Sequence, residues 1–164
     1  MKTTKSTRYQ AIVLLLIGSF LIGCASSKKA ATRERKINTV IKTARSYSGV
    51  PYKWGGTSRS GMDCSGLLLR SFQSINMEIP RTSIDQSKMG KNVGLSDVRE
   101  GDLVFFAAGK KKRKITHVGL VTNVRSKEDV RFIHASSSKG VVEVNLLSRY
   151  YKKIFIKAVR PEVR

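Results

Sequence analysis

The feature that most constrains the fold is a series of short strand-like runs in the C-terminal half of the chain. These runs are β-branched or aromatic and are separated by polar turns, which is typical of single strands. They cover Leu103–Ala108, Thr116–Val124, Val130–Ala135, Val141–Asn145 and Ile154–Arg160. Consecutive short strands joined by turns favour an antiparallel sheet. We therefore predict a sheet of about five or six strands.

Two helical patterns precede these strands. The first has an apolar stripe of helical spacing that ends at Gly49, made of Ile37, Val40, Ile41, Ala44 and Tyr47. The second runs from Cys64 to about Ile75, with Leu68 and Phe72 on its apolar face. Helices followed by strands indicate an α+β domain in which the helices pack on the sheet.

An aromatic loop that ends in glycine, Pro51–Gly56, joins the two helical segments. Its Trp54 is the only tryptophan of the chain, and we expect this side chain to pack against the core. Two roles are open to Tyr52. Its ring can pack, or its hydroxyl can point at a reaction centre as a hydrogen-bond donor.

The N-terminus has the three parts of a secretory signal. Lys2, Lys5 and Arg8 precede the apolar run Ala11–Ile22, and small residues then lead to Cys24. The apolar run has 12 residues, whereas a membrane-spanning helix needs roughly 18. Residues 1–23 are therefore predicted to be a signal peptide.

The ending Leu21-Ile22-Gly23-Cys24 resembles the lipobox of bacterial lipoproteins. That resemblance implies cleavage before Cys24 and acylation of this cysteine, with palmitate as an expected acyl chain, so that the protein is anchored to a membrane. We expect it in the cell envelope, on the periplasmic side of an outer membrane if the organism has one. Because lipidation uses Cys24, Cys64 remains a lone thiol and no disulfide between the two is expected.

Residues 24–36 are small and basic, and they are predicted to be a flexible tether with a span of roughly 20 Å. The domain that follows is predicted to cover residues 37–161. One domain with a single core suits the 141 residues that remain after residues 1–23 are removed.

The chain is strongly basic, with a formal net charge of +21 that falls to +18 without residues 1–23. An exported chain meets wall carboxylates, envelope phosphate polymers and anionic lipids, so we expect these polyanions as partners. Nucleic acid is not expected, because no recognition motif accompanies the charge. The basic run Lys110–Lys114, just before His117, is interpreted as a solvated loop tip.

Cys64 stands where a glycine-bounded turn gives way to the second helix. Unpaired N–H groups and the helix dipole at such a position lower the pKa of a thiol, and they can also hold an oxyanion. The alternative is a small buried core residue. A lone thiol in an oxidising compartment favours the reactive role.

The chain has only two histidines, His117 and His134, and both lie in predicted strands. Thiol catalysis needs a base and a third group that orients the base, and two histidines can fill these roles. Two alternatives stay open: each can be a hydrogen-bonded strand histidine, or both can join Cys64 in a zinc site, although the short ligand pairs typical of zinc sites are missing.

Six motifs then occur in the order seen in the NlpC family of papain-like cell-wall cysteine peptidases. They are Tyr52-Lys53-Trp54-Gly55-Gly56, Asp63-Cys64-Ser65-Gly66, Arg81-Thr82-Ser83 with Gln86, Gly101–Phe106, His117–Leu120 and Ile133–Ala135. The resemblance covers Ile37 to Pro161. With the lipobox, the chain is similar to the Spr-type murein endopeptidase lipoproteins.

The resemblance implies a papain-like fold and a thiol mechanism. Cys64 is the nucleophile, His117 is the general base and later the general acid, and His134 orients His117. The bonds cleaved are amide bonds of peptidoglycan stem peptides or cross-links, through an acyl-enzyme, with no cofactor and no metal. The residues implied to bind substrate or the oxyanion are Tyr52, Asp63, Ser65, Arg81 and Ser83.

Three alternative functions remain beside this one. The same thiol and imidazole serve N-acetylmuramoyl-L-alanine amidases and acyl transferases, and a wall-binding lipoprotein can lack catalysis altogether. A protein that has lost catalysis usually lacks its nucleophile or its base, and both are present here. We expect the protein to be a monomer.

Overall fold

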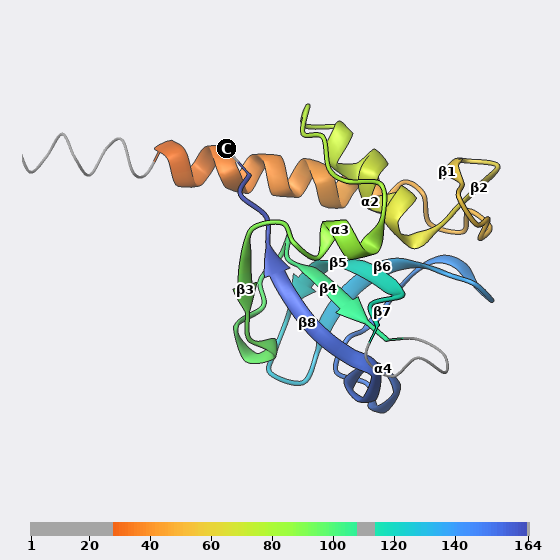
Figure 1. Ribbon diagram of the computed structural model, residues 1–164. Coiled ribbons are helices and arrows are strands. Elements are labelled where there is room, and N and C mark those ends of the chain that lie inside the picture. The colour runs from red at the N-terminus through yellow and green to blue at the C-terminus, as the bar shows by residue number, and fades with distance from the viewer. Residues whose placement is uncertain (1–27, 108–113, 164) are drawn as a thin grey trace, which may run out of the picture. The chain divides into compact units, whose positions relative to one another are not determined.

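The computed structural model describes residues 28–107 and 114–163, and it divides into two compact units, residues 1–35 and 36–164 (Figure 1). The predicted signal peptide, Cys24 and most of the Lys110–Lys114 run lie outside the described residues. No helix in the part of the chain that is described is both long enough and apolar enough to cross a membrane.

The described end of the first unit, residues 28–35, is helical, although the sequence predicts a flexible tether there. The physical reason lies in its composition. Ala30, Ala31 and the charged residues around them are good helix formers, and the stretch has no glycine or proline. The Thr32 hydroxyl also donates to the Lys28 carbonyl oxygen at 2.9 Å, within one helical turn.

The second unit begins with helical residues 36–45 and contains three further α-helices, which are α2 (Cys64–Gln73), α3 (Ser83–Gln86) and α4 (Arg149–Ile154). A 3₁₀ turn, η1, covers Leu95–Asp97. Two short strands, β1 (Thr57–Ser58) and β2 (Gly61–Met62), pair with each other just before α2.

The remaining strands form one antiparallel sheet of six, in the order β3-β8-β4-β5-β6-β7. Their bounds are β3 Lys91–Val93, β4 Leu103–Phe106, β5 His117–Val124, β6 Val130–Ser136, β7 Gly140–Asn145 and β8 Phe155–Arg160. The predicted α+β class and the antiparallel sheet are therefore confirmed. The strand β3 and the helix α4 were not predicted from the sequence.

Side chains alternate across this sheet and build a core on each face. On one face, Leu103 and Phe105 of β4 and Val118 and Leu120 of β5 pack in the same apolar cluster as the buried side of α2. On the opposite face, Phe106 lies in a second cluster against which side chains of α4 pack. The sheet thus lies between α2 and α4 (Figure 1).

The prediction that Trp54 packs against the core is wrong, because its side chain is 86% exposed. The backbone explains the difference. Gly56 N–H donates to the Lys53 carbonyl at 2.9 Å, and Gly55 has a φ of +73°, so Trp54 lies at the tip of a tight turn. The indole borders a surface pocket instead.

The pairing of β5 with β6 contains an irregularity that bears on the site. Val121 pairs with Phe132 and Asn123 pairs with Arg131, so Thr122 is an extra residue with no partner in β6. Such an extra residue is a β-bulge. His117 lies at the start of β5 and His134 lies in β6. Along the paired strands, both histidines lie on the Val121–Phe132 side of the bulge.

Candidate active site

Cys64 is the first residue of α2, and Asp63 caps the helix. The Oδ1 atom of Asp63 accepts a hydrogen bond from Gly66 N–H at 2.7 Å, which satisfies one of the unpaired donors at the helix start. The thiol is buried, with 7% of Cys64 exposed, and the backbone N–H groups of Val118, Ser65 and Cys64 itself act to lower its pKa. The thiol therefore sits between the start of α2 and the start of β5.

The sequence predicts a lowered thiol pKa, and the structure corrects this prediction. Burial raises the pKa of Cys64 above its ordinary value of 9.0, and the backbone N–H groups only partly offset the effect. The nearby Asp63 carboxylate raises it further. The resting thiol is therefore protonated, and it needs a base when it reacts.

Asp63 is held from several sides. Its carboxylate receives two hydrogen bonds from Arg81, at 2.7 Å and 3.0 Å, and Gly55 N–H donates to it at 2.9 Å. The Ser65 hydroxyl donates to Asp63 at 3.1 Å and accepts from Arg81 at 2.8 Å. Burial favours a raised pKa for Asp63, but Arg81 and the other donors outweigh burial and hold the pKa below 3.8. Asp63 is an ionised anchor that ties α2 to its surroundings.

A pocket of about 560 Å³ opens beside the thiol. The structure brings together there all the residues predicted on the substrate side. The lining includes Cys64 together with Tyr52, Asp63, Ser65, Arg81 and Ser83. Burial, with smaller contributions from Cys64 and Asp63, raises the pKa of Tyr52, so its hydroxyl stays neutral and can donate a hydrogen bond.

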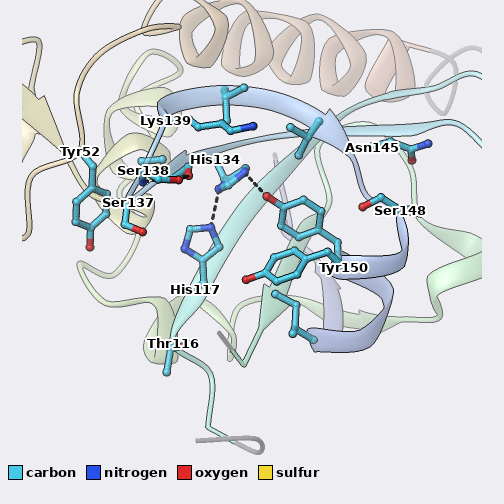
Figure 2. Close-up of a pocket in the computed structure, with 16 residues that line it drawn as sticks. Tyr52, Thr116, His117, His134, Ser137, Ser138, Lys139, Asn145, Ser148 and Tyr150 are labelled. Atoms are coloured by element: carbon cyan, nitrogen blue, oxygen red, sulfur yellow. Dashed lines mark hydrogen bonds between the residues drawn. The ribbon is translucent and has the colours of Figure 1, made fainter. Parts of the chain in front are cut away.

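The two histidines form a directly bonded pair (Figure 2). His117 Nε2 lies 2.8 Å from His134 Nδ1, and the ring planes are nearly perpendicular, at 89°. His134 is 3% exposed, and its ring stacks on Phe132 with a centroid distance of 5.0 Å. The second imidazole is therefore fixed by packing as well as by its hydrogen bond.

Both imidazoles are neutral near pH 7. Burial lowers the pKa of His117 from 6.5 to about 4. Burial and the neighbouring His117 lower the pKa of His134 to about 3. A neutral imidazole has one nitrogen lone pair that can take a proton, which is the form a general base requires.

Tyr151 of α4 is a third member of this chain of contacts, and sequence reasoning missed it. Its hydroxyl oxygen lies 2.9 Å from His134 Nε2. The only signal in the sequence is a pair of adjacent tyrosines, Tyr150 and Tyr151, just before the last predicted strand. Nothing in that pattern distinguishes a residue of the site from a surface aromatic.

The histidine pair lies in a second pocket, of about 680 Å³, that adjoins the first. Tyr52 and Thr116 line both pockets. His117 directly precedes Val118, whose backbone N–H acts to lower the pKa of Cys64, so the imidazole and the thiol lie at the same end of β5. Because Nε2 of His117 faces His134, Nδ1 is the nitrogen left for exchanging a proton with the thiol.

The described residues offer no cluster of three or more His, Cys, Asp or Glu side chains that could hold a metal ion. The histidines that the zinc alternative would use instead face each other through a hydrogen bond. As it stands, the arrangement has the parts of nucleophilic thiol catalysis: a nucleophile, a base and a residue behind the base.

Comparisons with known proteins agree on one family. The NlpC/P60 family model matches residues 49–160, a range that contains every site residue named above except Cys24. The crystal structure of an NlpC/P60 family protein from Bacillus cereus superposes with a TM-score of 0.67 at 31% identity, over 76% of this chain and 39% of that one.

Two relatives extend the comparison. A murein DD-endopeptidase MepS/murein LD-carboxypeptidase of Escherichia coli K12 is 39% identical over 115 residues, which is 70% of this chain but only 57% of that protein. A probable endopeptidase of Haemophilus influenzae is 32% identical over 158 residues, covering 90% of this chain and 94% of the relative.

Proposed function

The chain belongs to the NlpC/P60 family, and from that premise we propose that it is a cysteine peptidase that hydrolyses amide bonds of peptidoglycan stem peptides or cross-links. The observation that carries the proposal is the position of Cys64 at the start of α2, beside the strand that begins with His117, with His134 bonded 2.8 Å behind the base. The names of the relatives, a murein endopeptidase and a probable endopeptidase, support the same reaction class.

In the first half of the reaction, His117 Nδ1 takes the proton of the Cys64 thiol as the sulfur attacks the scissile carbonyl carbon. The carbonyl oxygen becomes an oxyanion, and the proposal assigns its stabilisation to N–H donors at the start of α2 and to the neutral Tyr52 hydroxyl, which lines the thiol pocket. The tetrahedral intermediate then collapses. The C–N bond breaks, the leaving amine takes the proton from His117, and a thioester remains on Cys64.

In the second half, water attacks the thioester while His117 takes a proton from it. Collapse of this intermediate breaks the C–S bond, returns the proton to the sulfur and releases a carboxylic acid. His134 keeps the His117 ring in place through both halves, since it contacts Nε2 of His117 and leaves Nδ1 for proton transfer.

The two pockets suit the two sides of the scissile bond. The acyl side lies in the thiol pocket, where the Asp63–Arg81 ion pair provides both a carboxylate and a guanidinium. The leaving amine lies on the histidine side, because His117 protonates it. The described residues that line this second pocket include the hydroxyl groups of Ser136 to Ser138 and the cation of Lys139, but no acidic side chain (Figure 2). Such a lining suits a leaving fragment that carries a carboxylate.

Replacement of Cys64 by Ala tests the proposal. Without the nucleophile, cleavage of purified peptidoglycan should be lost, and mass spectrometry of the released muropeptides measures it. The thermal unfolding midpoint should stay nearly unchanged, because alanine fills almost the same space. Full activity in Cys64→Ala would rule out the thiol mechanism. In the parent, release of intact stem peptides from the glycan would instead identify an amidase.

We further propose that Cys24 carries a lipid that anchors the protein to a membrane of the cell envelope. The support is the basic and apolar leader that ends in Leu21-Ile22-Gly23-Cys24. We also propose that the enzyme is a monomer. The same location brings the basic surface next to anionic polymers of the wall.

Metabolic labelling with palmitate tests the anchor. The parent should take up label and sediment with membranes, whereas Cys24→Ala should take up none and be released or remain an unprocessed precursor. Cys64→Ala is the matched control, because it removes the other cysteine of the chain and should label like the parent. Label that persists in Cys24→Ala would disprove lipidation at this residue.

A further inference from the structure

Packing holds Tyr151 so that its hydroxyl contacts His134 Nε2, the ring nitrogen that does not face His117. Its ring makes an edge contact with Phe132, with a centroid distance of 4.8 Å, and a tilted contact with Phe106 at 5.5 Å. These contacts fix the ring, and the hydroxyl oxygen then lies 2.9 Å from His134 Nε2. The hydrogen bonds connect Tyr151 to His134 and His134 to His117, so we assign its effect on the reaction to its contact with His134.

The hydrogen bond between His117 Nε2 and His134 Nδ1 contains one proton, and two arrangements of that proton are possible. If His117 Nε2 carries it, neutral His117 has a lone pair at Nδ1 and can accept the thiol proton. If His134 Nδ1 carries it, neutral His117 must hold its own proton at Nδ1 and cannot act there as a base. Only the first arrangement is productive.

The productive arrangement places a demand on His134. Because its Nδ1 must be an acceptor, neutral His134 carries its proton at Nε2, and this N–H needs an acceptor of its own. The residue is 3% exposed, so water has little access to it. An unpaired buried N–H is costly, more so than an unpaired acceptor. The Tyr151 hydroxyl oxygen is the partner that the structure places there.

We propose that Tyr151 is a positioning residue for the reaction: its hydroxyl accepts the Nε2–H of His134 and thereby selects the His134 tautomer that keeps His117 ready to act as a base. The same contact stabilises the state in which His117 is protonated, because His117 Nε2–H then donates to His134 Nδ1. The kinetic part of this inference rests on the proposed peptidase function, whereas the tautomer of His134 can be measured without any substrate.

The chain offers a matched pair of variants. Tyr151→Phe keeps the ring and its contacts with Phe106 and Phe132, and it removes only the hydroxyl. Tyr150→Phe is the control for the tautomer measurement, because Tyr150 is the adjacent residue of α4, is 57% exposed and has no hydrogen bond to His134 among the described contacts. Thermal unfolding midpoints of both variants, compared with the parent, show that the fold is retained.

The first measurement is nitrogen NMR of the full chain labelled with ¹⁵N-histidine and purified without a histidine tag. Only two histidines contribute signals, and His134→Asn assigns them. In the parent near pH 7.5, His134 should be neutral with its proton mainly on Nε2. In Tyr151→Phe the population with the proton on Nδ1 should rise, and in Tyr150→Phe it should stay as in the parent. A parent His134 that is protonated mainly on Nδ1, or a tautomer population unchanged in Tyr151→Phe, would overturn the proposal.

The second measurement is muropeptide cleavage as a function of pH. Tyr151→Phe should lower kcat by about 10-fold, well short of the ~10⁴-fold that a wrong tautomer costs when it is locked in place, while KM stays within about twofold. The acid limb of the pH–rate profile should also move, because the pKa of His117 depends on the hydrogen bond that its Nε2–H donates to His134 Nδ1. Equal kcat values and pH profiles in the parent and Tyr151→Phe would refute the positioning role. If the parent cleaves nothing, the proposed function fails while the NMR result still decides the tautomer.

Discussion

At the residue scale, the thiol of Cys64 is not a strong nucleophile by itself. A helix N-terminus normally lowers the pKa of a thiol, but here burial outweighs the surrounding N–H groups and raises it. In the proposed mechanism, reactivity therefore depends on His117, whose neutral imidazole removes the proton when a carbonyl carbon is in place. Until substrate arrives, the buried thiol is protected from oxidants.

The two histidines should differ in their effect on thiol alkylation. His117→Ala removes the proton acceptor, so it should lose hydrolysis by a factor of about 10³ or more and should also slow alkylation of Cys64 near neutral pH. His134→Ala should lose much of the hydrolysis but slow alkylation less, and His134→Asn should retain more activity than His134→Ala. Iodoacetamide rates as a function of pH measure this. Alkylation of His117→Ala at the parent's rate would contradict the role of His117 as base.

The buried histidines should also make the protein acid-sensitive. Their pKa values in the folded state, about 4 for His117 and about 3 for His134, lie below the ordinary 6.5. The unfolded chain therefore takes up protons as pH falls below about 6.5 while the folded chain does not, and stability falls over the range from about 6.5 to about 4. Asp63, whose folded pKa is lowered, keeps its stabilising effect down to about 4 and loses it only at lower pH.

Urea unfolding at pH 7.5 and pH 4.5 measures this acid sensitivity. We expect the parent to lose about 2 kcal/mol between these values, less than complete burial would give, because His117 is only half-buried. The double variant His117→Asn/His134→Asn should lose less over the same range. An equal loss in both proteins would assign the acid sensitivity to other groups.

At the element scale, α2 is held in place by a close approach of two backbones. A Cβ atom on Gly66 would lie 2.3 Å from the carbonyl oxygen of Gly56 and 3.0 Å from Asp63 Oδ1. Gly66 is therefore required in the first turn of α2 for a steric reason. The loop that ends at Gly56 and the helix that carries Cys64 are packed as one rigid piece.

Gly66→Ala should push the start of α2 away from that loop. We expect a loss of unfolding free energy of about 1–3 kcal/mol from overpacking, and a fall in kcat of about 10²-fold, because a shift of the thiol by about 1 Å misplaces the nucleophile. Gln73→Ala, at the exposed end of the same helix, is the control and should change both quantities little. Chemical denaturation and muropeptide cleavage give the two values. Parent-like cleavage by Gly66→Ala would show that the close approach does not position Cys64.

The helices and strands differ in how far the sequence alone predicts them. The helix α2 is predicted from its apolar residues at helical spacing, and the strands β4 to β8 are predicted from runs of β-branched and aromatic residues, because these side chains are buried. The strand β3 has only three residues, two of them exposed, and it depends on pairing with β8. The helix α4 has six residues and no side-chain hydrogen bond at its N-cap. Neither carries a pattern of its own.

The candidate site divides in a similar way. Residue types and spacing predict Cys64, His117 and His134 as a set, and the structure places the histidines in direct contact. The direction of the thiol pKa could not be predicted, since burial decides it. Tyr151 could not be predicted either, because its role depends on α4 packing against the face of the sheet that bears His134.

At the scale of the whole molecule, the excess of basic residues has few internal partners. The described ion pairs engage the carboxylates of Asp63, Asp85, Asp102, Asp129 and Glu143. The chain has 32 basic and 11 acidic residues, so most of its cations remain for solvent or for an anionic partner. A surface of this kind increases the encounter rate with polyanions and loses that effect in salt.

Binding to intact peptidoglycan should therefore weaken with ionic strength. Cys64→Ala is the suitable protein, since it should bind the wall without digesting it. Between about 50 mM and 500 mM NaCl the Debye length shrinks to roughly a third, and the fraction that sediments with purified wall should fall several-fold. Sedimentation that is unchanged at high salt would mean that the net charge does not drive wall binding.

The bulge at Thr122 determines which face of the sheet His117 shares. Residues directly opposite each other in an antiparallel pair project to the same face. With Val121 opposite Phe132, counting back along β5 places His117 on the same face as His134. If the register of Val124 and Val130 continued without the extra residue, Leu120 would stand opposite His134, and the two imidazoles would project to opposite faces. One inserted residue, well away from the thiol, thus decides whether the chain has a bonded histidine pair or two histidines separated by the sheet.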